Sequence, residues 1–295
     1  MKITFSDKKP KDKKMAQIVF YKEDESIVGI HGGRKTIFVG LVESGKINRR
    51  KLVNLARKII ILAKGAKIEK IAINFDEFAK STGLAKAEFA EVLAVNFELA
   101  NFEFVKYKSR PKDGWNFVRD VFIFGKISPE IKKVFKKGQI TGQEVNAARI
   151  LANTPGGEVT PRVLAEAARA TVRRLPIKVS ILGKGDIEKL KMGGVLGVAQ
   201  GAKEEPKFII MEYFAGRPEE KPVVLIGKGV TFDTGGLNIK TEDKMYEMHM
   251  DMSGAAAVIH AIVAAARLKI AKNVIGLIPA VENMLSSESY RPGDV

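Results

Sequence analysis

Hydrophobic residues along the chain follow two alternating spacings, and this alternation predicts an α/β protein. Short apolar runs rich in β-branched and aromatic residues predict strands, whereas apolar residues three and four positions apart predict helices. In the first half of the chain these patterns predict strands at residues 16–21, 36–41, 70–75, 102–107 and 118–124, and helices at 48–64 and 86–99. Together these elements indicate a small αβα domain.

A long helical pattern follows at residues 129–152, with an expected interruption near Gly138. It ends at NTPGG (153–157), where Asn, Pro and two Gly predict a break in regular structure. Thr160 and Pro161 are residue types favoured at the N-cap and the first position of a helix. We therefore expect a new helix to begin there and to extend to residue 174.

The second half of the chain is richer in strands. Apolar runs predict strands buried on both faces at 177–182, 208–214, 223–226 and 273–281, with an Ala-rich helix at 251–268. The last residues, YRPGDV, are turn-like and add no closing element. We expect an N-terminal αβα domain (1–127), a connecting helix and linker (128–158), and an α/β domain with a central mixed sheet, incomplete at its C-terminal end (159–295).

Composition narrows the class of protein. A chain of 295 residues with 45% hydrophobic content can fold as two ordinary domains. It contains no run of 18 apolar residues and no apolar core behind its basic start, so we expect neither a membrane span nor a secretory signal, and a cytoplasmic location. The absence of cysteine excludes disulfides and thiolate metal sites, and three histidines disfavour a His-rich zinc site.

The formal net charge of +16 is compatible with a nucleic-acid partner. The alternative is a solvated, lysine-rich surface. The lysines are scattered, and no basic motif interleaved with aromatic residues is present. A nucleic-acid partner is therefore not favoured by the pattern.

Candidate chemistry gathers in the glycine-rich segment GKGVTFDTGG (227–236), which follows a predicted buried strand and is expected to be a loop. It contains Lys228 and Asp233, and Lys240 and Asp251 lie downstream. Carboxylates suit Mg, Mn and Zn, and a lysine binds a metal only as the neutral amine. A lysine that stays protonated would instead polarise a carbonyl group.

Other interpretations of glycine-rich segments fit less well. Such loops often cradle phosphate, but the Walker pattern G-x-x-x-x-G-K-[ST] is absent. The run MGGVLG (192–197) lacks the G-x-G-x-x-G order of a dinucleotide-binding loop. The residues alone thus indicate a site at 227–236 and leave its ligand open.

The segment VVLIGKGVTFDTGGLNIKTEDKMYEMHMDMSGAAAVIHAI resembles the signature region of the leucyl aminopeptidase (cytosol aminopeptidase) family of dinuclear metallopeptidases. The similarity includes LANTPGGEVTPRVLAEAA and GGVLGVAQGAKEEPKFIIMEY upstream, and NVIGLIPAVENM and YRPGDV downstream. It covers residues from about 140 to 295. The first 125 residues match in outline and resemble that family's N-terminal domain, an αβα unit similar to macro domains.

The resemblance implies a role for each matched residue. Lys228, Asp233 and Asp251 resemble metal ligands, with Asp233 as the carboxylate that bridges two divalent ions (Mn or Zn). Lys240 resembles the catalytic lysine that polarises the scissile carbonyl. Met248 resembles a wall of the substrate pocket, although a plain core methionine is an equal alternative. The implied activity is removal of leucine and other apolar residues from peptides with a free N-terminus, in a homo-hexamer.

The sequence departs from the family in one respect. The family places a further Asp, Glu and Arg in an NTDAEGR segment beyond RPGDV, and these 295 residues contain no such segment. Glu282 and Glu288 precede that point and cannot substitute for it, although Glu282 is a candidate to support the site indirectly. We expect a partial sequence that holds at most one ion well and has no turnover, with assembly left open. The alternatives are a non-catalytic paralogue and a DNA-binding or structural protein of the same fold.

Overall fold

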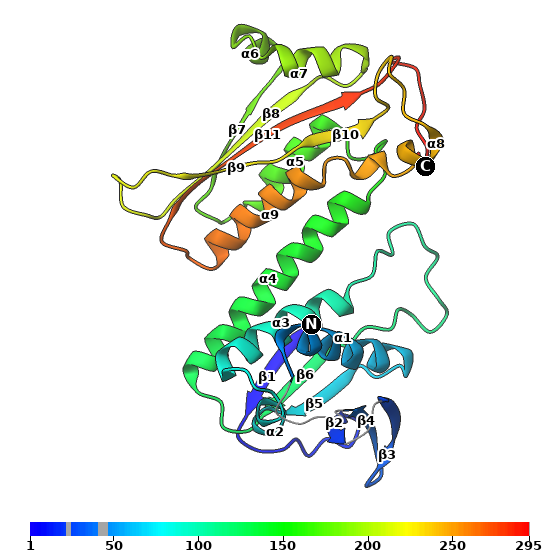
Figure 1. Ribbon diagram of the computed structural model, residues 1–295, viewed down its shortest axis with the longest axis vertical. Coiled ribbons are helices and arrows are strands. Elements are labelled where there is room, and N and C mark those ends of the chain that lie inside the picture. Colours follow the sequence, from blue (N-terminus) through cyan, green and yellow to red (C-terminus); the bar gives the residue numbers. More distant parts are fainter. Residues whose placement is uncertain (22–24, 41–46, 295) are drawn as a thin grey trace. The chain divides into compact units, whose positions relative to one another are not determined.

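The computed structural model describes residues 1–21, 25–40 and 47–294, so that Leu41 of the predicted strand 36–41 and Val295 lie outside the described residues. The chain forms two compact units, Met1–Gln143 and Glu144–Val295, each built on its own sheet and hydrophobic core (Figure 1). The predicted α/β class is confirmed. The three segments expected from the sequence, 1–127, 128–158 and 159–295, stay a prediction.

The first unit contains a six-stranded sheet in the order β1-β6-β5-β2-β4-β3. The pairs are parallel except β3 with β4, which is an antiparallel pair at one edge. Its elements are β1 (Lys2–Ser6), β2 (Ala16–Tyr21), β3 (Ile27–His31), β4 (Arg34–Gly40), α1 (Arg49–Gly65), β5 (Lys70–Asn74), α2 (Phe75–Lys80), α3 (Lys86–Asn101), β6 (Asp120–Phe124) and the first part of α4 (Pro129–Asn153). Buried aromatic rings lie at the centre of its core, where the ring of Phe75 packs at a tilt against Phe89 and edge-on against Phe135.

The predicted strand at residues 102–107 is wrong. The chain is extended after α3 and then turns at Lys106 and Tyr107, with no strand assigned over this range. Strand propensity depends on the tertiary context, and here β6 occupies the place between β1 and β5 while residues 102–107 pair with no strand of the described chain. The strand β1, which pairs with β6, was missed because its sequence is short and is followed by a run of lysines.

The expected interruption of the long helix near Gly138 is also wrong, because α4 is continuous through that position. A Cβ atom on Gly138 would lie 2.8 Å from the carbonyl oxygen of Glu91, and one on Gly142 would lie 2.6 Å from the Cβ of Glu98. Both glycines therefore allow α4 to approach α3 closely. The glycines in this stretch of the sequence therefore reflect helix packing within the first unit and do not mark a helix break.

The second unit contains the mixed sheet that the sequence predicts. Its order is β10-β11-β8-β7, with β9 also paired to β11; β9 and β10 run parallel to β11, while β8 runs antiparallel to β11 and β7. Its elements are α5 (Pro161–Thr171), β7 (Lys178–Leu182), α6 (Lys184–Lys189), α7 (Gly193–Val198), the 3-10 turn η1 (Ala199–Gly201), β8 (Lys207–Phe214), β9 (Val223–Ile226), β10 (Gly229–Asp233), α8 (Glu242–Met245), the 3-10 turn η2 (Met248–Met250), α9 (Ser253–Arg267) and β11 (Asn273–Asn283).

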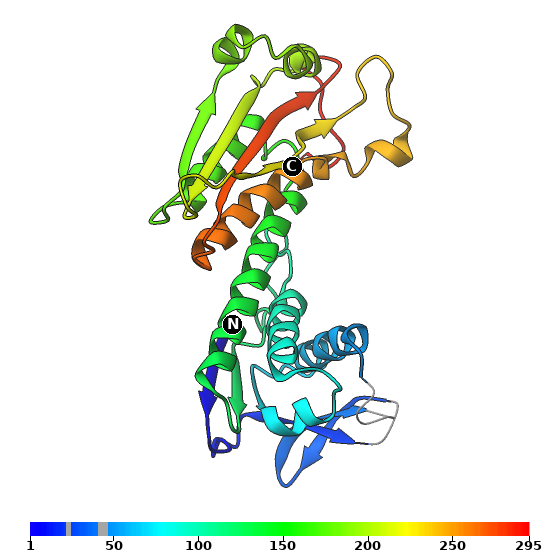
Figure 2. The same ribbon diagram turned by 60° about the vertical axis from the view of Figure 1, so that its left-hand side comes forward.

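The helices α5 and α9 cover one face of this sheet, and α6 and α7 lie on the opposite side from α9 (Figures 1 and 2). The face toward α5 and α9 carries the alternating side chains of Ile209, Met211 and Tyr213 from β8, which belong to one buried cluster with both helices. This packing fixes the beginning of α9 near the last residue of β9 and the first residue of β10. The sheet thus positions the segment in which the candidate residues lie.

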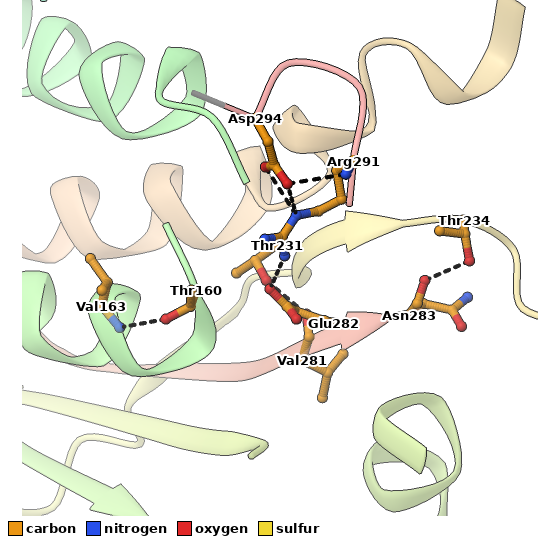
Figure 3. Close-up of polar contacts among 9 residues, drawn as sticks. All are labelled: Thr160, Val163, Thr231, Thr234, Val281, Glu282, Asn283, Arg291 and Asp294. Atoms are coloured by element: carbon orange, nitrogen blue, oxygen red, sulfur yellow. Dashed lines mark hydrogen bonds and ion pairs between the residues drawn. The ribbon is translucent and has the colours of Figure 1, made fainter. Parts of the chain in front are cut away.

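The predicted start of the helix at Thr160 is confirmed. The hydroxyl oxygen of Thr160 accepts a hydrogen bond from the backbone N–H of Val163 at 3.4 Å, and Pro161 occupies the first turn (Figure 3). The helix ends at Thr171, earlier than the expected residue 174. Arg174 adopts a positive φ of 67°, which continued helix would not permit.

Residues 242–267 make the one stretch of the described chain that is long and apolar enough to cross a membrane by length and composition. Half of its most apolar window is buried inside the protein, as in a core helix of a folded domain, and α9 contributes nine buried residues to the core. This stretch is therefore weak support for a membrane span.

Candidate active site

The glycine-rich segment is only partly a loop, which corrects the expectation from the sequence. Residues Gly229–Asp233 form strand β10, so that Asp233 is the last residue of a strand and Lys228 directly precedes it. The pairing of β10 with β11 shifts register between Val230 and Phe232, which leaves Thr231 as an extra residue. Such irregularities re-aim the side chains that follow them, here that of Asp233.

Close backbone approach brings Asp251 to Lys228. A Cβ atom on Gly227 would lie 2.6 Å from the carbonyl oxygen of Gly254, and the backbone N–H of Ala255 donates to the carbonyl oxygen of Lys228 at 2.9 Å. Only glycine at position 227 tolerates this close approach of the two backbones. The start of α9 is thus fixed against the segment before β10, and Asp251, two residues ahead of the helix, comes with it.

The four candidate residues come together as two ion pairs. The Nζ atom of Lys228 lies 2.6 Å from both carboxylate oxygens of Asp251, and the Nζ atom of Lys240 lies 2.9 Å from Oδ2 of Asp233. The carboxylates are mostly buried, with 17% and 14% of their side chains exposed, whereas 57% of Lys228 is exposed. The arrangement thus places both carboxylates inside, with Lys228 toward solvent and Lys240, 28% exposed, partly buried beside Asp233.

The pKa values of the two carboxylates are displaced in opposite directions. Burial raises the pKa of Asp251; the contact with Lys228 opposes this, but the charge and a hydrogen bond of neighbouring Asp233 raise the pKa further, so that it stays above its ordinary value. Burial also raises the pKa of Asp233. Hydrogen bonds to that carboxylate from Lys240, Asn283 and the Gly235 amide outweigh burial and hold its pKa below the ordinary value.

The donor set of this site fits a divalent ion. Two neighbouring carboxylates supply hard oxygen donors, and Lys228 supplies an amine nitrogen once it is deprotonated. The two ammonium groups occupy the positions at which a cation would balance the acidic pair. Among the residues that the structure describes, no group of three or more His, Asp or Glu side chains is arranged to hold a metal ion.

Met248 lies in the short 3-10 turn Met248–Met250 and is half-buried. This position fits both expectations for Met248, a wall of the substrate pocket and a core methionine. His260, by contrast, is a buried core residue whose Nδ1 lies 2.8 Å from Oε2 of Glu144. Its role in the fold is therefore separate from the candidate site.

Asn283 contacts the site directly and is not among the residues predicted from the sequence. Its side-chain N–H donates to Oδ1 of Asp233 at 2.6 Å, and its carbonyl oxygen accepts hydrogen bonds from the backbone N–H and the hydroxyl of Thr234 at 2.9 and 2.8 Å (Figure 3). The available signal was the end of the predicted strand at residues 273–281. Two parallel strands end at the same sheet edge, which brings Asn283 opposite Asp233.

Glu282, the neighbour that the sequence had suggested as indirect support, pairs instead with Arg291. The guanidinium of Arg291 donates to Glu282 at 2.7 Å and also contacts both carboxylate oxygens of Asp294 at 3.1 Å (Figure 3). Burial raises the pKa of Glu282, and Arg291 offsets only part of this. Glu282 thus anchors the RPGD turn, on the opposite side of β11 from Asn283.

Two profiles of one family match the chain. The Cytosol aminopeptidase family, catalytic domain, matches residues 146–295, and the Cytosol aminopeptidase family, N-terminal domain, matches residues 27–111. A probable cytosol aminopeptidase of Rickettsia typhi is 36% identical over 260 residues, covering 88% of this chain and 52% of that protein. The cytosol aminopeptidase of Rickettsia prowazekii is 35% identical over 260 residues with the same shares.

Solved structures agree. A mutant of tomato leucine aminopeptidase superposes with a TM-score of 0.73 at 28% identity, covering 92% of this chain and 53% of that one. The bottromycin maturation enzyme BotP in complex with Mn superposes with a TM-score of 0.79 at 24% identity, over 96% of this chain and 62% of that one, and shares the fold. The chain spans about half the length of the curated relatives it matches. By these profiles and relatives, the chain belongs to the cytosol aminopeptidase family.

Proposed function

We propose that the protein is a metal-dependent aminopeptidase that removes apolar residues, such as leucine, from peptides with a free N-terminus. The observation that carries this proposal is the pairing of Lys228 with Asp251 and of Lys240 with Asp233 beside β10, in a chain of the cytosol aminopeptidase family. A cytoplasmic location and peptide substrates follow from the same proposal. Assembly into a homo-hexamer is left open for this chain.

Each residue has a proposed role. Lys228, Asp233 and Asp251 would hold a divalent ion, Mn or Zn, with Asp233 as the carboxylate shared with a second ion. Bound ions of this kind supply an activated water and polarise the carbonyl of the peptide bond. Lys240 would donate a hydrogen bond to the oxygen of that carbonyl as negative charge develops on it. Met248 would contact the side chain of the first residue.

These 295 residues would not catalyse the reaction by themselves. They supply three ligands for one ion and only Asp233 for the other, because the family's NTDAEGR sequence does not occur in them. We expect no release of leucine from leucyl-p-nitroanilide by the purified 295-residue chain with added Mn²⁺. Measurable release, absent from a Lys240→Ala chain, would show that other residues complete the site.

The gene beyond the codon for Val295 provides the second test. An Asp, a Glu and an Arg in an NTDAEGR-like segment at the expected spacing would support the aminopeptidase. A stop codon would favour a non-catalytic paralogue. Salt-sensitive DNA binding that survives the loss of Lys228 and Asp233 would favour a binding role.

A further inference from the structure

Asn283, the last residue of β11, contacts the end of β10 in two independent ways. Its side-chain amide donates to Oδ1 of Asp233 at 2.6 Å. Its backbone carbonyl accepts from the N–H and the hydroxyl of Thr234 at 2.9 and 2.8 Å. The backbone contact fixes the strand end, whereas the side-chain contact acts on the carboxylate itself.

The donors around Asp233 are divided between its two oxygens. Oδ1 accepts from Asn283 and from the backbone N–H of Gly235 at 3.0 Å, and Oδ2 faces the Nζ atom of Lys240. The donors on Oδ1 are neutral amides, so they orient the carboxylate without neutralising its charge. The oxygen Oδ2 therefore faces a positive charge, which in this structure is the ammonium group of Lys240.

Gly236 lies next to the amide of Asn283. Its φ of 70° lies in the left-handed region, and a Cβ atom there would lie 3.4 Å from Oδ1 of Asn283. The glycine turn after Asp233 thus passes beside the amide that donates to Asp233.

We propose that Asn283 is a positioning residue of the metal centre: its amide fixes Oδ1 of Asp233, so that Oδ2 is presented to a divalent ion. The inference rests on the proposed function, because it assumes that Asp233 is a metal ligand. Outer partners of this kind commonly contribute 10–100-fold to metal affinity. Asn283 would thus support the ligand Asp233 without contacting the metal ion.

The experiment measures Mn²⁺ binding to the 295-residue chain by electron paramagnetic resonance and calorimetry. We expect Asn283→Ala to weaken binding about 10–100-fold. The backbone contact with Thr234 survives this substitution, so the strand end is retained. The matched control is Asn273→Ala, at the other end of β11, where a buried amide contacts the backbone of Gly216, Arg217 and Glu220. We expect that variant to lower thermal stability and to leave the Mn²⁺ affinity unchanged.

A second substitution separates the hydrogen bond from packing. Asn283→Gln keeps an amide donor on a longer side chain, and we expect it to recover part of the Mn²⁺ affinity lost in Asn283→Ala. This comparison also tests the role of the amide if the alanine variant folds poorly. Unchanged affinity in Asn283→Ala, an equal loss in Asn273→Ala, or no recovery with Gln would overturn the role of Asn283 while leaving the proposed function intact. No saturable Mn²⁺ binding by the unchanged chain would overturn both.

Discussion

The second unit contains two clusters of acidic and basic side chains that balance their charges differently. In one, Glu144 of α4 lies 2.8 Å from Nδ1 of His260 and also pairs with Arg267, both on α9. Burial raises the pKa of Glu144, but the hydrogen bonds from His260 and Arg267 outweigh burial and hold it below the ordinary value. A single carboxylate thus has two partners.

At the candidate site two carboxylates share one location, and the pKa of Asp251 stays above its ordinary value although Lys228 contacts it. In the Glu144 cluster the protein's own side chains complete the charge balance, so the cluster stabilises the fold. Asp233 and Asp251 have one lysine partner each, but they lie close enough that Asp233 raises the pKa of Asp251. A bound cation would relieve this repulsion, which is the difference expected between a structural cluster and a metal site.

The largest expected effect is on stability at the Glu144 cluster. Glu144→Ala leaves His260 buried without its acceptor and should cost about 3 kcal/mol of unfolding free energy. The control is Glu166→Ala, which removes an exposed pair with Arg162 and should cost about 0.5 kcal/mol or less. Urea denaturation at pH 7 measures both. Equal losses in the two variants would show that the Glu144 cluster is not a special structural contact.

The second prediction applies the opposite test to the candidate site. Asp251→Asn should weaken Mn²⁺ binding by more than about 100-fold, beyond the loss that an outer partner causes, without lowering stability. Because the folded pKa of Asp251 is raised, its ionised form opposes folding as pH rises through that value, and the neutral amide removes this penalty. Asp243→Asn, an exposed acid on α8, should change neither property. A large loss of stability in Asp251→Asn would contradict the contrast between the clusters.

The third prediction concerns acid. The folded pKa of Glu144 lies below its ordinary value of 4.5, so its contribution to stability is present above that pH and is lost as the pH falls through the folded pKa. The unchanged chain should therefore lose more stability between neutral pH and pH values below about 4.5 than Glu144→Gln does. Denaturation curves over this range measure it, and parallel losses would contradict the assignment.

The smallest effect is expected at the N-cap of α5, which belongs to neither cluster. Thr160→Ala should cost about 1 kcal/mol by removing the acceptor for the Val163 N–H, and should not change Mn²⁺ affinity. Thr171→Ala is the control, because that hydroxyl donates back to carbonyls of its own helix. Melting temperatures compare them, and a greater loss at Thr171 would overturn the prediction.

Much of the fold could be predicted because local patterns and tertiary packing agree there. The strand β9 and the Thr160 cap are examples, since a β-branched run and an N-cap residue act through near neighbours. The expected burial of β9 on both faces is wrong, however, because Val223, Val224 and Ile226 are exposed. Predictions failed where a distant element decides the outcome. Gly138 serves contact with α3, and residues 102–107 have a strand-like composition without a place in the sheet.

The candidate site was also predicted only in part from the sequence. Lys228, Asp233, Lys240 and Asp251 were indicated by the glycine-rich segment and given roles by the resemblance to family motifs. The structure brings them together, although their roles stay predictions. Asn283 was missed because its contact depends on the register between β10 and β11, 50 residues apart in the chain. Spacing along a sequence does not reveal which residue of a neighbouring strand lies opposite a carboxylate.

Titration of the 295-residue chain with Mn²⁺ at neutral pH is the direct test of whether Lys228, Asp233 and Asp251 form a metal site. We expect saturable binding of one ion per chain, lost in Asp233→Asn and Asp251→Asn and retained in Asp243→Asn. Absence of saturable binding, or equal binding by all four chains, would contradict it.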